Sequence, residues 1–222
     1  MSVAAPVLPG SVRVAAAGVS HRFGARLALQ PLSFDVSSPG VVAVTGENGS
    51  GKSTLLRILT GLLRPTAGQT VLEHDKTALP PRARRFVTGL ATPELSFYEE
   101  FSAAENLLFA AETRGLPDPR GAVHKALDAV QLSPRADDRV GGFSSGMKQR
   151  LRLAFAVLHG PALLMLDEPG SHLDDAGRAV VERLVKSWSG EGLVIIATND
   201  PQEMRLADRN IQLRGRGLGG PA

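Results

Sequence analysis

A glycine-rich stretch at residues 46–53 has the residue types and the spacing of a phosphate-binding loop. Its sequence, GENGSGKS, matches the pattern G-x-x-x-x-G-K-[ST]. Glycines let the backbone wrap closely around an anion, so that its N–H groups face phosphate oxygens. Lys52 adds a compact positive charge for the β- and γ-phosphates of a nucleotide, and the Ser53 hydroxyl can ligate Mg²⁺. The predicted nucleotide-binding residues here are Gly46, Glu47, Asn48, Gly49, Ser50, Gly51, Lys52, Ser53 and Thr54.

Two adjacent carboxylates follow the apolar run at residues 163–166. Asp167 is placed to hold Mg²⁺ through its water shell, as the second half of a nucleotide site. Glu168, one residue further, would lie near the γ-phosphate and polarise an attacking water. Acidic pairs at strand ends are often only solvated, so the phosphate loop upstream is what makes this pair a candidate catalytic and metal site.

A second candidate anion cradle lies shortly before that run, where the sequence FSSGMKQR occupies residues 143–150. Serines and a glycine at the start of a helix present backbone N–H groups and the positive end of the helix dipole. The alternative is an ordinary capped helix, and the segment alone does not separate the two.

The elements that must position these residues are short apolar runs at 41–44, 163–166 and 193–196, each followed by a polar cluster. Such runs are typical of buried parallel strands, whose carboxyl ends carry ligands in open α/β sheets. Helical patterns cover 53–63, 103–113, 122–130, 145–158 and 175–188. Alternating pieces at 12–14 and 32–36 predict an antiparallel pair beside the main sheet. We therefore expect an α/β fold with one site at one sheet edge.

Composition excludes several other kinds of site. The chain has 222 residues, a net charge of +3 and no cysteine, which rules out disulfides, thiolate zinc sites and a cysteine nucleophile. Its five histidines are scattered, so we expect no histidine metal site. No apolar run approaches the length of a membrane span, and residues 1–10 lack a leader pattern, so a cytoplasmic location is expected.

Taken together, the order of these motifs resembles the ATP-binding subunits of ABC transporters over residues 12–213. The resemblance rests on Phe23-Gly24, the phosphate loop, residues 143–147, the acidic pair with Pro169, and residues 171–174. It implies a P-loop NTPase fold of ABC type within one domain, 1–222. That fold has a mostly parallel core sheet with helices on both faces, an antiparallel β edge and a helical subdomain at roughly 92–160.

The resemblance also implies ATP and Mg²⁺ as cofactors and a head-to-tail dimer with two ATP molecules at its interface. Phe23 would stack on adenine, although a core or edge-strand aromatic is the alternative. Four signature residues would touch the γ-phosphate held by the opposite subunit, and Asp174 would link the two sites, or simply cap a helix. The four are Ser144, Ser145, Gly146 and Met147.

The implied partners are a second copy or a paralogue, and a transmembrane permease on a separate chain that meets residues 98–101. The implied location is the inner face of the cell membrane, and no nucleic acid is expected. A soluble family ATPase that acts on nucleic acid or ribosomes usually carries two ATP domains or long insertions, which 222 residues cannot hold. A nucleotide kinase would leave the 143–147 cradle without a role.

Two positions depart from the family pattern. The usual glutamine after the strand near 86–90 is missing, so Glu94 or Thr92 would make the Mg²⁺-side contact. Asn199 stands where a histidine usually contacts the γ-phosphate, and its amide can still donate a hydrogen bond or orient water. We expect slow Mg²⁺-dependent hydrolysis, the alternative being an ATP-gated clamp that hardly hydrolyses. Ser145 and Met147 are variants that resemble bacterial exporters of the haem type.

Overall fold

The computed structural model describes residues 10–214. The prediction about a leader and the ends of the predicted 1–222 domain lie outside the described residues. A parallel sheet of five strands forms the centre, in the order β6-β7-β8-β3-β9. The strands are β6 (Thr88–Ala91), β7 (Leu163–Asp167), β8 (Leu193–Ala197), β3 (Gly40–Thr45) and β9 (Arg209–Gln212). Three of them, β3, β7 and β8, are the predicted apolar runs.

The central strands are apolar throughout because both of their faces are covered. Side chains alternate across a strand, so neighbours enter opposite layers. In β8, Val194 and Ile196 pack with the helices of the 103–189 segment. Leu193 and Ile195 pack on the other face, with helix α1 (Lys52–Leu59) and with a second sheet. The predicted α/β fold, with helices on both faces of a parallel sheet, is therefore confirmed.

The second sheet is antiparallel, in the order β2-β1-β4-β5. Its strands are β1 (Val12–Phe23), β2 (Arg26–Ser37), β4 (Ala67–His74) and β5 (Thr77–Ala78). The predicted pair at 12–14 and 32–36 is confirmed as β1 and β2, but both strands are far longer than predicted. Register shifts between Ala16 and Arg22 break the alternation that the prediction used, which explains the missed length.

The helices are α1 (Lys52–Leu59), α2 (Pro81–Arg84), α3 (Ala103–Thr113), α4 (Pro119–Ala129), α5 (Ser145–Val157), α6 (Asp175–Ser189) and α7 (Pro201–Met204), with 3-10 turns at Ser133–Arg135 and Val140–Gly142. The five predicted helices are present as α1, α3, α4, α5 and α6; α3 has the predicted ends, the others are shifted by up to four residues, and the short helices α2 and α7 were not predicted. Helix α1 ends early because Gly61 has a φ of 82°. Helix α4 begins early because the Asp118 side chain accepts a hydrogen bond from Gly121 N–H and caps it.

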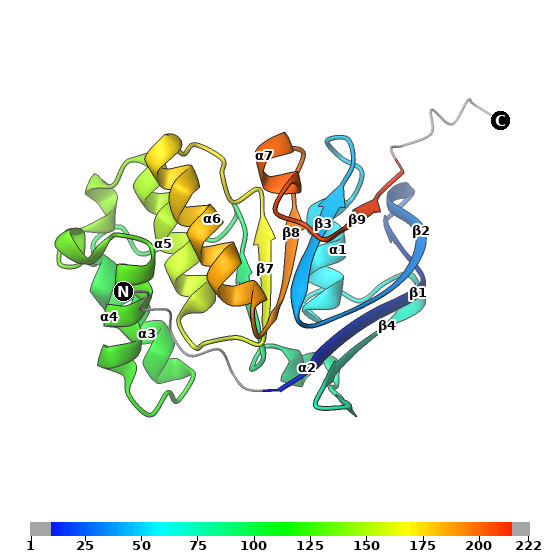
Figure 1. Ribbon diagram of the computed structural model, residues 1–222, viewed down its shortest axis with the longest axis horizontal. Helices are drawn as coiled ribbons and strands as arrows, with labels where there is room; N and C mark the ends of the chain where they lie inside the picture. The colour runs from blue at the N-terminus through cyan, green and yellow to red at the C-terminus, as the bar shows by residue number, and fades with distance from the viewer. Residues whose placement is uncertain (1–9, 215–222) are drawn as a thin grey trace.

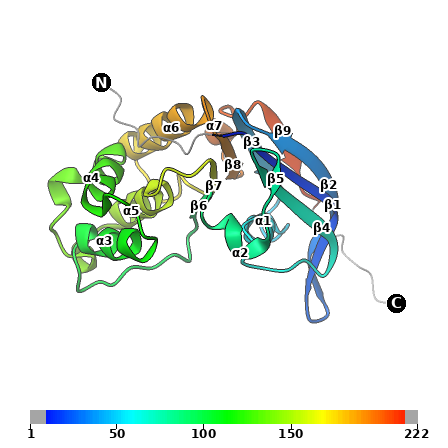
Figure 2. The same cartoon turned by 90° about the horizontal axis from the view of Figure 1, so that it is seen from below.

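The layers are visible in Figure 1, with the parallel sheet at the centre. Helices α3, α4 and α5 lie to its left, and strands β1, β2 and β4 lie to its right. Figure 2 shows the same two groups from below, separated by β7 and β8. Among the described residues, no helix is long and apolar enough to cross a membrane.

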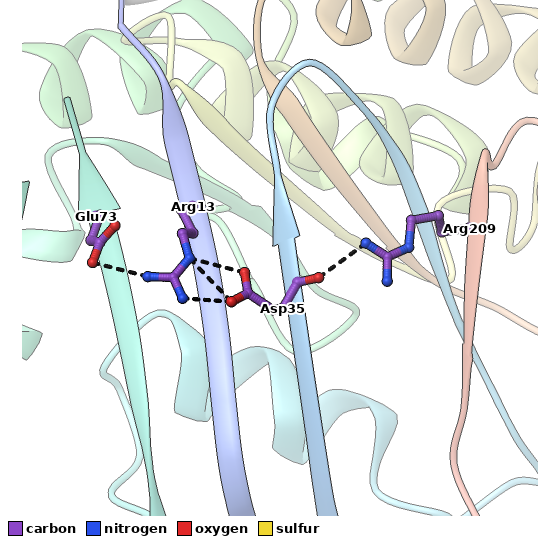
Figure 3. Close-up of polar contacts among 4 residues, drawn as sticks. All are labelled: Arg13, Asp35, Glu73 and Arg209. Atoms are coloured by element: carbon purple, nitrogen blue, oxygen red, sulfur yellow. Dashed lines mark hydrogen bonds and ion pairs between the residues drawn. The ribbon is translucent and has the colours of Figure 1, made fainter. Parts of the chain in front are cut away.

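A charged network ties the two sheets together on the outer surface (Figure 3). Arg13 of β1 donates hydrogen bonds to Asp35 of β2 at 3.0 Å and to Glu73 of β4 at 3.1 Å. Arg209 of β9 donates to the backbone oxygen of Asp35 at 3.0 Å. The network therefore links neighbouring strands of the antiparallel sheet and connects that sheet to β9.

The network makes stability depend on pH in a defined direction. Hydrogen bonds and charge from Arg13 hold the pKa of Asp35 below its ordinary value. The stabilisation is thus fully present above the unfolded-state pKa of about 3.9 and is lost as pH falls through the folded-state value. We expect Asp35→Asn to lower the thermal midpoint slightly at pH 7, because both partners are about half exposed.

Thermal unfolding followed by circular dichroism at pH 7 and at pH 3 measures this effect, with Asp128→Asn on the exposed face of α4 as the matched control. The gap between wild type and Asp35→Asn should narrow at the lower pH. If the difference in thermal midpoint between the two proteins grows on acidification, the pKa of Asp35 is not lowered by its contacts with Arg13.

Candidate functional site

The carboxyl ends of β3, β7 and β8 meet at one edge of the sheet, as predicted, because these strands are neighbours in the order β7-β8-β3. The chain leaves β3 into the phosphate loop at Gly46 and leaves β7 at Glu168. It leaves β8 at Thr198, where Thr198 N–H donates to Val44 O at 3.0 Å. Three segments far apart in the sequence thus converge at one edge.

Two glycines of the phosphate loop are required by its geometry. Gly51 has a φ of 104°, and a Cβ there would lie 2.4 Å from the backbone oxygen of Ala28. Gly46 has a φ of 147°, and a Cβ would lie 2.7 Å from Ser50 Oγ. Both positions exclude a side chain. The loop therefore turns tightly against β2 and delivers the chain into α1, whose N-terminus lies at the loop and can face an anion.

A cleft of about 340 Å³ lies over this loop. Lys52 is buried, and its Nζ donates to Gly46 O at 2.8 Å. Phe23, the last residue of β1, reaches the cleft with 49% of its surface exposed. Arg26 and Ala28 of β2 also line it, and sequence reasoning missed both because the length of β2 was not predicted. The described lining is Phe23, Arg26, Ala28, Asn48, Gly49, Gly51, Lys52, Ser53, Thr54 and Glu168.

Asp167 is 3% exposed at the end of β7. Burial raises its pKa; the hydrogen bond with Ser53 opposes this rise, and the neighbouring charges of Glu168 and Glu94 add to it. A buried carboxylate beside a hydroxyl and other carboxylates is a favourable oxygen environment for a hard cation. Ser53 and Asp167 therefore fit Mg²⁺ chemically, although the described residues contain no group of three or more His, Cys, Asp or Glu that could hold a metal alone.

Glu168 is held by the backbone in an uncommon conformation. Its φ is +48°, and its N–H donates to Ala197 O of β8 at 2.8 Å. Glu168 lines the cleft together with the loop residues, and its carboxylate accepts a hydrogen bond from Ser171 Oγ at 3.5 Å. The two adjacent carboxylates therefore lie in different environments: Asp167 is buried beside Ser53, and Glu168 lines the cleft.

Glu94 lies near Asp167 but is already paired. Arg57 of α1 and Thr92 both contact its carboxylate. The pKa of Glu94 is lowered overall. Burial alone would raise it, but hydrogen bonds from Thr92 and the backbone, together with the charge of Arg57, outweigh the effect of burial. Sequence reasoning missed Arg57, since nothing in the sequence relates a position on α1 to the loop after β6.

Asn199 touches the phosphate loop directly. Its Oδ1 accepts a hydrogen bond from Gly46 N–H at 3.2 Å, and its Nδ2 donates to Asn48 Oδ1 at 3.3 Å. The predicted position at the strand end beside Gly46 is confirmed. Its role in turnover remains a prediction.

The signature segment 144–147 does not line this chain's own cleft. Ser144 caps α5 by accepting a hydrogen bond from Met147 N–H at 3.2 Å, so the helix-cap interpretation holds for it. Asp174 likewise caps α6 by accepting from Gly177 N–H at 2.8 Å. Neither contact involves a phosphate-loop residue.

Two buried polar residues that sequence reasoning missed support the segment after the acidic pair. Gln149 of α5 donates to Pro169 O at 3.1 Å, and Glu203 of α7 accepts from Gly170 N–H at 2.6 Å. Burial raises the pKa of Glu203. A polar residue on a buried helix face was the available signal for Gln149.

Comparisons with known proteins agree with this geometry. The ABC transporter family model matches residues 29–171. Nod factor export ATP-binding protein I of Rhizobium sp. (strain N33) is 35% identical over 205 residues, 89% of this chain and 66% of that protein. The uncharacterized ABC transporter ATP-binding protein YxlF of Bacillus subtilis is 38% identical over 174 residues, 78% of this chain and 57% of that protein.

The same fold occurs in the dimeric structure of a post-hydrolysis state of the ATP-binding cassette MJ0796 bound to ADP and Pi. The TM-score is 0.79 at 22% identity, and the match covers 92% of this chain and 97% of that one. The chain spans only part of its curated relatives, for example 23% of the ABC transporter A family member 8 of Dictyostelium discoideum. The chain belongs to the ABC transporter family and has the fold of its ATP-binding cassettes.

Proposed function

We propose that this chain binds and hydrolyses ATP and powers a membrane ABC transporter. The observation that carries the proposal is the cleft over the phosphate loop, where Lys52, Ser53 and Glu168 face one space and Asp167 lies beside Ser53. A cationic anchor, a pair of oxygen ligands and a carboxylate that lines the cleft are the parts that phosphoryl transfer to water requires.

Each side chain has a distinct task in that reaction. Phe23 stacks on the adenine, and Lys52 with the loop N–H groups holds the phosphates. Ser53 and Asp167 would hold Mg²⁺, which neutralises phosphate charge when bound. Glu168 accepts a proton from the attacking water as the new P–O bond forms and the bond to the ADP oxygen breaks. Glu94 would contribute on the metal side only by exchanging its Arg57 partner.

We also propose a head-to-tail dimer with two ATP molecules at the interface. Support comes from the solvent-facing residues Ser144 and Ser145, which lie outside the chain's own cleft and are free to meet the cleft of a second copy or a paralogue. Asp174 would lie at the same interface. The structural neighbours MJ0796 and its post-hydrolysis state are described as dimers.

The membrane partner we propose is a permease on a separate chain, which would hold this subunit at the inner, cytoplasmic face of the membrane. An aromatic groove of about 450 Å³ is the proposed docking surface, which we define by Phe86, Tyr98, Phe109, Arg114 and Phe155. Phe109 and Tyr98 are about 60% exposed. No carboxylate lines the groove among the described residues, so it suits an apolar helix that carries an acidic residue.

We expect Tyr98→Asp and Phe109→Asp to release the subunit from its permease, because each places a charge in an apolar contact. The measurement is the fraction of the chain that sediments with membranes from cells that co-express a multi-span permease with which the wild-type chain sediments. Leu62→Asp is the matched control, since Leu62 is 71% exposed and lies outside the groove. If the membrane-bound fraction falls equally in the control, or falls in neither groove variant, the groove is not part of the interface.

The test of hydrolysis is Mg²⁺-dependent phosphate release by the purified wild type, compared with Glu168→Gln. Slow release above that background supports the ATPase. Release equal to background favours the clamp that binds ATP and hardly hydrolyses it. The narrower proposal that the permease is a haem exporter rests on Ser145 and Met147 alone. Curated bacterial relatives with named substrates include proteins of Nod factor export and of bacitracin transport.

A further inference from the structure

Asn199 makes hydrogen bonds of both directions to the phosphate loop. Its Oδ1 accepts from Gly46 N–H at 3.2 Å while its Nδ2 donates to Asn48 Oδ1 at 3.3 Å. An amide side chain can do both at once, whereas a carboxylate can only accept. The residue therefore spans the first part of the loop from the end of β8.

The backbone on both sides of Asn199 is held by hydrogen bonds, which fixes the direction in which the Asn199 side chain leaves the chain. Thr198 is 1% exposed, and its Oγ1 accepts from Asp200 N–H at 2.9 Å. The Asp200 carboxylate pairs with Arg178 of α6 and also caps α7. Both neighbours of Asn199 are thus anchored, one to the parallel sheet and the other to two helices.

Gly46 is held from two sides. Asn199 takes its N–H, and Lys52 Nζ donates to its carbonyl oxygen at 2.8 Å. With a φ of 147°, Gly46 has a backbone that other residues rarely adopt, so local preference does not hold it there. Side-chain hydrogen bonds from Lys52 within the loop and from Asn199 outside it therefore help to order Gly46 before a ligand arrives.

We propose that Asn199 is a positioning residue that orders the Gly46–Asn48 part of the phosphate loop for nucleotide, in place of contacting the γ-phosphate itself. The inference rests on the proposed nucleotide binding. Loop N–H groups cradle the α- and β-phosphates, which ADP and ATP share. Loss of the Asn199 contacts should therefore lower the affinities for ADP and ATP by the same factor. Loss of a γ-phosphate contact would lower the affinity for ATP alone.

The experiment is calorimetric titration of Asn199→Ala with ADP and with ATP, each with Mg²⁺, in a Glu168→Gln background so that ATP is not consumed. We expect both affinities to fall about three- to tenfold, the range that one or two exposed hydrogen bonds supply. Gln202→Ala is the matched control, because Gln202 is an exposed amide three residues away that lines a different groove. Its affinities should equal those of the parent.

Asn48→Ala provides an independent variant for the same contact. Because it removes one partner of the Asn199 hydrogen bond, the double variant should lose less than the product of the two single losses. A loss of ATP affinity with ADP affinity unchanged overturns the proposal in favour of a γ-phosphate contact. Unchanged affinity for both nucleotides also overturns it. If the parent protein binds neither nucleotide, the proposed function itself fails, which is a separate result.

Discussion

Glu168→Gln should slow ATP hydrolysis by about 10²–10⁴-fold while ATP still binds, because an amide cannot accept the proton of the attacking water. The carboxylate lines the cleft and faces the loop, and its backbone is fixed by the hydrogen bond to Ala197. Glutamine has nearly the same shape, so the loop and the neighbouring Asp167 keep their positions. The measurement is steady-state phosphate release at saturating ATP and Mg²⁺.

A second readout belongs to the same variant. With hydrolysis blocked, ATP should hold two subunits together, and light scattering after size exclusion should show a dimer in ATP. Glu191→Gln is the matched control, since Glu191 is exposed at the opposite end of β8. It should leave the rate unchanged. A Glu168→Gln variant that hydrolyses normally rules out this carboxylate as the base, and one that stays monomeric in ATP contradicts the head-to-tail dimer.

Lys52→Ala should weaken ATP binding by about ten- to a hundredfold or abolish it, since a charge-assisted hydrogen bond to phosphate contributes about 1.5–3 kcal/mol. The side chain is buried at the start of α1, and it also donates to Gly46 O, so the alanine variant loses loop order together with charge. Lys52→Met tests the ammonium group itself, because it keeps most of the side-chain volume while the charge and the hydrogen bond to Gly46 O are lost together.

Direct calorimetric titration with ATP measures the loss, and thermal unfolding confirms that the variants fold. Lys186→Met is the matched control, because Lys186 is an exposed lysine on α6 that pairs with Glu182, one turn away. Its ATP affinity should match wild type. Unchanged affinity in both Lys52 variants would remove the phosphate-loop assignment.

Residues close together in the chain carried the predictions that succeeded. The glycine-rich turn between β3 and α1 is local: its glycine spacing, Lys52 and the strand before it are all read from adjacent residues. The same holds for the apolar runs that became β3, β7 and β8, and for the 103–113 helix, where the Ser102 capping box sets the N-terminus. Local preference failed for β1, β2 and β4, because register shifts and alanines hide their alternation.

The pairing of distant segments was decided only in the folded chain. The sequence indicates that three strand ends carry polar clusters, but the order β7-β8-β3 follows from how both faces of the sheet bury their apolar side chains. The ion pair of Arg57 with Glu94 joins α1 to the loop after β6, and Asn199 meets Asn48 across 151 residues of chain. Forming such contacts costs chain entropy, which the packing of the whole core must offset. No pattern among neighbouring residues therefore predicts them.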